Sequence, residues 1–152
     1  MKPVSHIIIS FSLGAAVWFF AKSLYAAMVC FLSGFLLDID HIIEYIVHYG
    51  WKDFTFKKCY QACEQVFKKE GEYQFKKLHL IFHSAEIALL FWLITSYTKN
   101  IYLFAGVLGY SVHLILDSIG NQLYPYSYFI VWRAINRFSP DRLFRKRITQ
   151  KK

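Results

Sequence analysis

The chain has 152 residues, of which 56% are hydrophobic and 20% aromatic. A soluble domain of this length has too little interior to bury so much apolar surface, so the composition favours a membrane protein. A net charge of +8 can indicate nucleic acid or anionic lipid as a partner. The basic residues lie outside the apolar runs, which favours acidic lipid headgroups, and we expect no nucleic-acid partner.

Four apolar runs are arranged as two close pairs. They are Ile7–Ala21, Leu24–Leu37, Ala85–Tyr97 and Ile101–Leu116. With their polar ends they predict helices over about 5–21, 24–40, 80–97 and 101–118, each near the roughly 20 residues that span a hydrocarbon core. Short turns separate the helices of each pair. We therefore expect an all-α fold, a four-helix integral membrane bundle of two helical hairpins, in one domain over residues 1–152.

The first run also has features of a cleaved signal peptide. Lys2 precedes it and small residues follow it. The second run begins almost at once, however, and a paired hairpin accounts for both runs together. A retained helix is the simpler interpretation.

Two polar segments carry most of the basic charge. An insertion over about 42–78 holds seven lysines between Lys52 and Lys77, and a tail over 123–152 holds eight basic residues from Arg133 onward. Lysines around an apolar stripe predict an interfacial helical insertion, and the mixed aromatic and basic residues of the tail predict a C-terminal interfacial helix. The expected partners are membrane lipids, with anionic headgroups favoured.

The distribution of lysine and arginine predicts the orientation. If the N-terminus is inside, only Lys22 and Lys99, in the two short turns, face outward, and the other sixteen basic residues face the cytoplasm. Both termini are then cytoplasmic.

Histidines and carboxylates occur at one end of each apolar run. They are His6; Asp38, Asp40 and His41; His79, His83 and Glu86; and His113 with Asp117. If the helices alternate in direction, all nine groups gather on one side of the membrane. Such groups are costly beside lipid and are rarely kept there without a role. Imidazoles and carboxylates together are typical ligands of a divalent metal such as zinc.

Helical spacing groups several of these residues on common faces. His113 and Asp117 are four residues apart, so a helix places them one turn apart, where both can bind one metal. His79, His83 and Glu86 share a face at the i, i+4, i+7 spacing. The structural alternatives are a His–Asp hydrogen bond within the bundle and a hydrated interfacial face.

Asp38, Asp40 and His41 lie within one turn after an apolar run. Paired acids with a histidine suit a site that holds two metals. Carboxylates are unfavourable at a helix C-terminus because the macrodipole is negative there, and a bound cation would offset that cost. The alternative is simply a polar helix end. His6 is weak evidence by itself and gains weight from its position on the same membrane face.

Other catalytic motifs do not occur. The three cysteines, Cys30, Cys59 and Cys63, form neither a disulfide framework nor a zinc ribbon, and reduced thiols are expected. The sequence contains no H-E-x-x-H, P-loop, G-x-S-x-G or Gly-rich dinucleotide motif.

The ordered motifs resemble those of the YdjM-like family of membrane-bound metal-dependent hydrolases. The resemblance covers roughly residues 6 to 121 and rests on His6, Leu37-Asp38-Ile39-Asp40-His41, His83-Ser84 and Gly109–Asp117. The last stretch is the closest match. Leu37 stands where the family tends to have proline, and His79-Leu-Ile-Phe-His83-Ser84 lacks the family's Arg-Gly, which puts the role of His79 in doubt.

The resemblance implies a distant similarity to the zinc-dependent phospholipase C and single-strand nuclease superfamily. It implies one to three divalent ions, zinc by preference, in an integral protein of a bacterial inner or plasma membrane. The metal ligands would be His6, Asp38, Asp40, His79, His83, His113 and Asp117. Glu86 or His41 would act as general base or would orient a ligand. We expect hydrolysis of a phosphoester or phospholipid by metal-activated water.

Two non-catalytic functions are the alternatives. One is a membrane protein that binds or conducts metal ions, although the outer halves of the runs are nearly free of charge, which argues against conduction. The other is an interaction scaffold without metal, in which alanine substitutions at the cluster would change nothing.

Overall fold

The computed structural model describes residues 3–68 and 75–145, and the regular structure in these ranges is helical. One isolated β-bridge, between Leu123 and Phe144, is the exception. The expectation of an all-α chain is therefore confirmed for the described ranges. Parts of the predicted insertion (69–74) and of the predicted tail (146–152) lie outside them.

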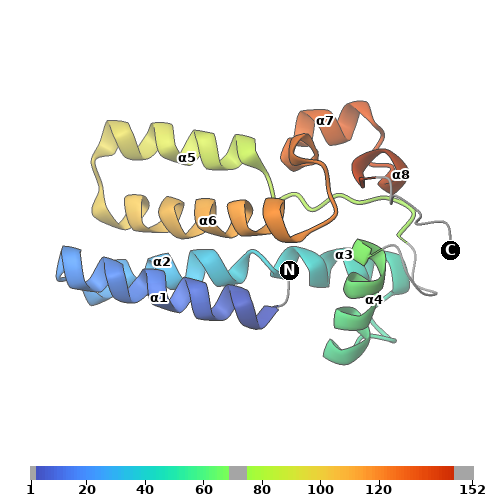
Figure 1. Ribbon diagram of the computed structural model, residues 1–152, viewed down its shortest axis with the longest axis horizontal. Coiled ribbons are helices and arrows are strands. Elements are labelled where there is room, and N and C mark those ends of the chain that lie inside the picture. Colours follow the sequence, from blue (N-terminus) through green and yellow to red (C-terminus); the bar gives the residue numbers. More distant parts are fainter. Residues whose placement is uncertain (1–2, 69–74, 146–152) are drawn as a thin grey trace, which may run out of the picture.

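Two helical hairpins lie side by side, with their turns at the same end (Figure 1). The first consists of α1 (Pro3–Ala21) and α2 (Leu24–Leu36), and the second of α5 (Ala85–Thr98) and α6 (Ile101–Gly120). Lys22 and Lys99 adopt left-handed backbone conformations with φ of 50° and 51°, which end the first helix of each hairpin. Ser23 and Asn100 then cap the second helix through their side-chain oxygens.

Helix α2 packs against both α1 and α6, and α5 packs against α6. Glycines allow the close approach of α2 and α6. A Cβ atom added to Gly109 would lie 2.1 Å from the carbonyl oxygen of Cys30, and one added to Gly34 would lie 3.2 Å from the carbonyl oxygen of Gly109. Small residues at such contacts are typical of helices that associate in lipid.

Three segments are long and apolar enough to cross a membrane: Val4–Ala21, Leu24–Tyr49 and Ile101–Gly120. Helix α5 is apolar but shorter, at 14 residues. Large apolar side chains cover the outside of the hairpins, as at Phe20, which is 83% exposed. These features are compatible with a membrane protein.

Two of the expected helices have different boundaries. The predicted helix 24–40 is interrupted by a turn at residues 37–38, after which α3 (Ile39–Tyr49) continues. The predicted helix 80–97 begins only at Ala85, because Ser84 is extended and its hydroxyl caps the helix by accepting the Ile87 N–H. Residues 78–84 before it form no helix, and Leu80 has a φ of 40°.

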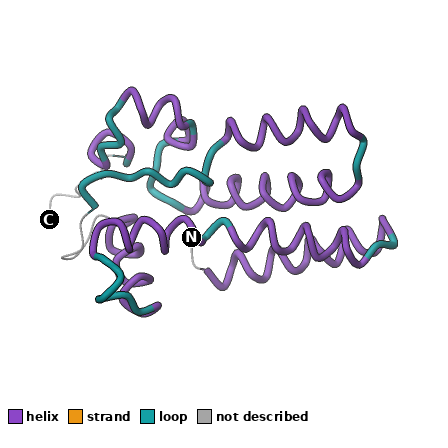
Figure 2. Tube along the Cα trace, turned by 180° about the vertical axis from the view of Figure 1, so that it is seen from behind, coloured by secondary structure: helices purple, strands orange, loops and turns teal. Residues whose placement is uncertain are grey.

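The end opposite the turns holds α4 (Phe56–Lys68), η1 (Pro125–Tyr128), α7 (Ile130–Ile135) and α8 (Pro140–Leu143). The single C-terminal interfacial helix expected from sequence is thus three short helices. Prolines at the starts of η1 and α8 and left-handed residues Arg137 and Phe138 break it. Leu78, Leu123, Leu143 and Phe144 belong to a buried cluster that joins this tail to the segment before α5. Figure 2 shows that segment as a long loop leading into α5.

Candidate metal centre

Six of the residues singled out in the sequence meet at the end of the hairpins opposite the turns. They are His6 in α1, Asp38 in the turn between α2 and α3, His41 in α3, His83 before α5, and His113 and Asp117 in α6. They form three overlapping groups in which one ligand atom per residue lies within 4.8 Å of the others. His6, His83, His113 and Asp117 are buried, and Asp38 and His41 are partly buried.

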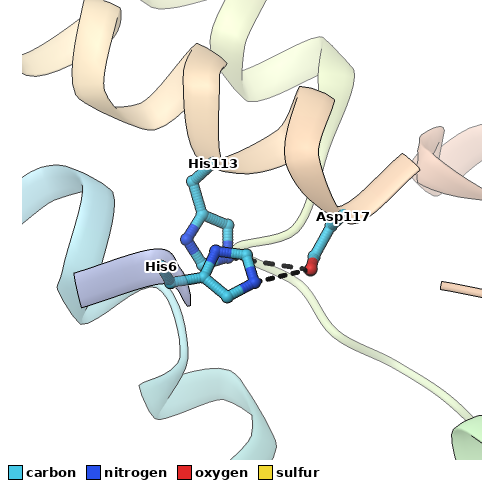
Figure 3. A group of neighbouring side chains, drawn as sticks. All are labelled: His6, His113 and Asp117. Carbon is cyan, nitrogen blue, oxygen red and sulfur yellow. Dashed lines mark ion pairs between the residues drawn. The ribbon is translucent and has the colours of Figure 1, made fainter. Parts of the chain in front are cut away.

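The predicted pair on α6 shares a site with the first helix (Figure 3). His6 Nε2 lies 3.1 Å from Asp117 Oδ1, and His113 Nε2 lies 3.7 Å from Asp117 Oδ2. The rings of His6 and His113 are 4.3 Å apart. Because Asp117 presents different oxygens to the two imidazoles, its carboxylate is placed to bridge two cations.

The two most buried histidines face each other through the same ring nitrogen. His113 Nδ1 lies 2.6 Å from the carbonyl oxygen of Gly34, and His83 Nδ1 lies 3.1 Å from Asp40 Oδ2. Both contacts require a proton on Nδ1, so a neutral ring has a lone pair on Nε2. The two Nε2 atoms are only 3.2 Å apart. Two buried acceptors so close together need a cation or a proton between them.

The remaining distances suit a small divalent ion. Ligand atoms at about 2.0–2.1 Å from a tetrahedral zinc are separated from one another by roughly 3.3–3.4 Å. Asp117 Oδ2 lies 3.5 Å from His83 Nε2, and Asp38 Oδ1 lies 3.7 Å from His113 Nε2. With the 3.2 Å between the two imidazoles and the 3.7 Å from His113 Nε2 to Asp117 Oδ2, all three pairs among His83, His113 and Asp117 approach the expected spacing. These residues therefore fit the ion implied by the resemblance.

Asp40 was expected among the metal ligands, but the structure places it behind His83. Its Oδ2 accepts the backbone N–H groups of Phe82 and His83, at 2.6 and 3.0 Å, together with the imidazole N–H of His83. A carboxylate that fixes the tautomer and orientation of a ligating histidine is a common partner in metal sites. Asp40 is therefore assigned to positioning His83.

His79 lies outside the cluster. Its Nδ1 is 3.2 Å from Glu44 Oε1, and its ring contacts Phe138. The expected i, i+4 chelate of His79 and His83 required a helix there, and residues 78–84 are not helical. We therefore remove His79 from the candidate ligands.

Glu86, the expected catalytic base, also lies elsewhere. Its carboxylate accepts the Ser84 hydroxyl at 2.6 Å and the backbone N–H groups of Ile130 and Val131 at 2.9 and 3.0 Å. These contacts place it at the N-terminus of α7, where a negative charge is favourable. Glu86 is therefore a helix cap between α5 and α7, and His41 is the expected base that remains in the cluster.

Buried side chains support the loop that carries His83. The Glu44 carboxylate accepts the N–H groups of His79 and Leu80, and the Tyr110 hydroxyl donates to the carbonyl oxygens of Phe82 and Ser84. The guanidinium of Arg133, which is 1% exposed, donates to the carbonyl oxygens of His79, Leu80 and His83. An irregular buried backbone needs such partners because it has no helical ones.

Arg133 had been expected at the membrane surface, as part of the basic tail. Burial lowers the pKa of its guanidinium, and the carboxylates of Asp40 and Glu86 act in the opposite direction. Arginine stays charged in proteins, so this cation lies behind the site rather than on the lipid. Its sequence context gave no signal of that role.

The cluster opens into a cavity of about 640 Å³ between α4 and the junction of α2 with α3. His6, Asp38, His41 and Asp117 line it, whereas His83 and His113 do not. A ligand in the cavity would therefore approach the carboxylate side of the cluster. Cavities of about 300–1,000 Å³ are typical of small-molecule sites.

No protein-family model matches the chain, and no curated protein or solved structure is significantly similar to it. The YdjM-like resemblance therefore rests on the quoted motifs alone.

Proposed function

We propose that this chain is an integral membrane hydrolase that uses a divalent ion, zinc by preference, to cleave a phosphoester or phospholipid. The observation that carries the proposal is the 3.2 Å distance between His83 Nε2 and His113 Nε2. The Nδ1 atom of each ring faces a hydrogen-bond acceptor, Asp40 for His83 and the Gly34 carbonyl for His113. A cation between the two Nε2 atoms satisfies both lone pairs. The motifs that resemble the YdjM-like family support the same site.

Three side chains hold the ion in this proposal, His83, His113 and Asp117, which leaves the fourth position of a tetrahedral ion for water. His6 is placed to complete a second site through the other oxygen of Asp117. When bound, the ion supplies Lewis acidity to a water and to the phosphoryl group. Oxygen and nitrogen ligands without a thiolate suit a catalytic rather than a closed structural site.

His41 is the proposed proton acceptor. Its Nε2 lies 3.7 Å from Asp38 Oδ1, and the ring lines the cavity and lies 4.9 Å from the ring of His83. In this proposal the ring takes a proton from an attacking water. The protonated ring then returns the proton to the leaving oxygen.

The hairpins cross the bilayer in this proposal, with the cluster and both termini on the cytoplasmic side. The basic asymmetry supports it, because the turns with Lys22 and Lys99 lie together at the far end (Figure 1). In a cysteine-free background, Lys22→Cys and Lys99→Cys should react with an impermeant thiol reagent in intact cells. Lys57→Cys, on α4, should react only after lysis, and the reverse pattern would contradict the orientation.

Turnover by purified, zinc-loaded protein tests the activity. A panel of phosphodiesters and short-chain phospholipids should be hydrolysed slowly by the unaltered chain and by Lys99→Ala, whose position is in the far turn. Asp117→Ala should retain no turnover because it removes a ligand, and His41→Gln should lower kcat by about 10²-fold or more while the zinc stays bound. A zinc-loaded protein that cleaves none of these esters would instead be a metal-binding protein without catalysis.

A further inference from the structure

The cavity beside the metal centre has two chemically different ends. One end carries the imidazoles and carboxylates of the cluster. The rest of the lining is mostly apolar, with Phe35, Leu36, Ile39, Ile42, Phe56 and Tyr60, and it also includes the polar side chains of Glu64, Asn121 and Gln122. A small hydrophilic phosphoester would leave these apolar walls in contact with water, which costs free energy in proportion to their area.

The apolar end is also the exposed end. Phe56 is 75% exposed, and Leu36, Ile39 and Tyr60 are between 42% and 44% exposed. At the other end, His6 and Asp117 are each 2% exposed. The most exposed lining residues are thus apolar (the mouth) and the most buried ones are polar (the floor), which is the polarity of an amphiphile that enters headgroup first.

The mouth continues the apolar surface of the candidate membrane span. Leu36 and Ile39 flank the turn between α2 and α3, and both belong to the apolar segment Leu24–Tyr49. Neighbouring side chains on that segment, such as Leu32 and Ile43, are also exposed, at 40% and 44%. A molecule lying in the bilayer beside α2 thus meets a continuous apolar path to the cavity.

We propose that this cavity is a lipid pocket that draws an amphiphile with a phosphoryl headgroup sideways from the membrane. The alkyl portion lies against Phe56, Tyr60 and Ile39, and the phosphoryl group reaches Asp117 and its partners at the floor. The assignment rests on the proposed metal centre, because a carboxylate floor attracts an anionic phosphoryl group only when a cation is bound. It narrows the preferred substrate class to lipids, so soluble phosphoesters should be the poorer substrates.

Binding of alkylphosphonates tests the pocket without hydrolysis, because a phosphonate has no ester to cleave. Butyl-, octyl- and dodecylphosphonate are titrated into zinc-loaded protein in nanodiscs. Burial of about 0.8 kcal/mol per methylene corresponds to roughly fourfold in affinity, so octylphosphonate should bind at least tenfold more tightly than butylphosphonate.

Two variants place a charge at the mouth: Phe56→Asp and Tyr60→Asp. Both positions are exposed on α4 and neither belongs to the cluster, so zinc content should be unchanged, whereas the gain with chain length should be much smaller than in the control. Tyr126→Asp is the matched control, because Tyr126 in η1 has the same 42% exposure as Tyr60 and does not line the cavity. Partitioning of the phosphonates into the lipid is common to all variants and cancels in the comparison.

An affinity that is independent of chain length, or a gain that survives in Tyr60→Asp, overturns the lipid pocket. The hydrolase proposal fails separately. If affinity depends on chain length but no phosphoester is cleaved, the lipid-pocket proposal is supported and the hydrolase proposal is refuted. If soluble phosphodiesters are cleaved as readily as short-chain phospholipids, the hydrolase proposal is supported and the lipid-pocket proposal is refuted.

Discussion

The two most buried histidines of the site, His113 and His83, are held by opposite means. His113 lies in the middle of α6, where the helix itself fixes its position one turn before Asp117. His83 lies in a segment without helix. The backbone groups of that segment form hydrogen bonds with the side chains of Asp40, Glu44, Tyr110 and Arg133. One half of the site thus depends on local backbone hydrogen bonds, and the other on side chains from α3, α6 and α7.

This difference determines which substitutions should affect metal binding. On the α6 side, only the ligands His113 and Asp117 and the carbonyl partner Gly34 should matter. On the His83 side, residues that never touch the ion should matter as well, because they hold the loop in place.

The largest effect is expected when either imidazole is removed. His83→Ala and His113→Ala should each lose stoichiometric zinc, because each removes a ligand from a buried site. Metal analysis of the purified variants measures this, with Lys99→Ala as the control that retains zinc. If the His83→Ala protein keeps the zinc content of the unaltered chain, the loop that carries His83 does not supply a metal ligand.

Replacement of Asp40 should weaken the metal site without emptying it. Asp40→Asn keeps the size of the side chain but loses the charge that holds the Nδ1 proton of His83. Zinc affinity should fall about 10–100-fold, measured by competition with a chelator. The same substitution at Asp141, in α8, is the comparison and should leave the affinity unchanged. Equal affinities of the two variants would mean that Asp40 does not position His83.

Replacement of Arg133 should act through stability. Arg133→Met fills a similar volume but leaves three buried carbonyl oxygens without their donor, which should cost about 3 kcal/mol. Thermal unfolding should show a lower Tm, with the loss greater than for Arg142→Met, since Arg142 is exposed. An unchanged Tm for Arg133→Met would show that the loop holds its shape without the guanidinium.

The smallest effect is expected at Glu86. Glu86→Gln weakens the cap of α7 and should lower the free energy of unfolding by about 1 kcal/mol. Zinc affinity and turnover should be unaffected, because the carboxylate faces Ile130 and Val131 rather than the cluster. A loss of turnover with zinc still bound would restore Glu86 as a catalytic group.

The same contrast explains which parts of the site could be predicted from the sequence. The apolar runs and the pair His113 and Asp117 follow from helical periodicity, and the structure brings that pair together with His6, Asp38, His41 and His83. The same periodicity was wrong for His79 and Glu86. Ser84 is a helix cap, so the helix begins after His83, and the stripe assumed across that point does not exist.

The supporting residues could not be predicted in the same way. Arg133 lies 50 residues from His83 in the sequence, and its neighbour Trp132 is typical of an interfacial helix. Only the tertiary fold shows that its guanidinium satisfies a buried loop. Glu44 lies one turn after Asp40 on α3, and the four-residue spacing places both acids on the face that contacts the loop. Helical periodicity could therefore have indicated its position.

X-ray absorption at the zinc edge tests the central claim most directly. We expect a first shell of nitrogen and oxygen at about 2.0–2.2 Å with the outer-shell scattering of at least two imidazoles. That imidazole signal should fall in His83→Ala reconstituted with excess zinc. A shell that contains sulfur at about 2.3 Å would place the metal at Cys59 and Cys63 instead, and protein that binds no zinc would contradict the metal centre altogether.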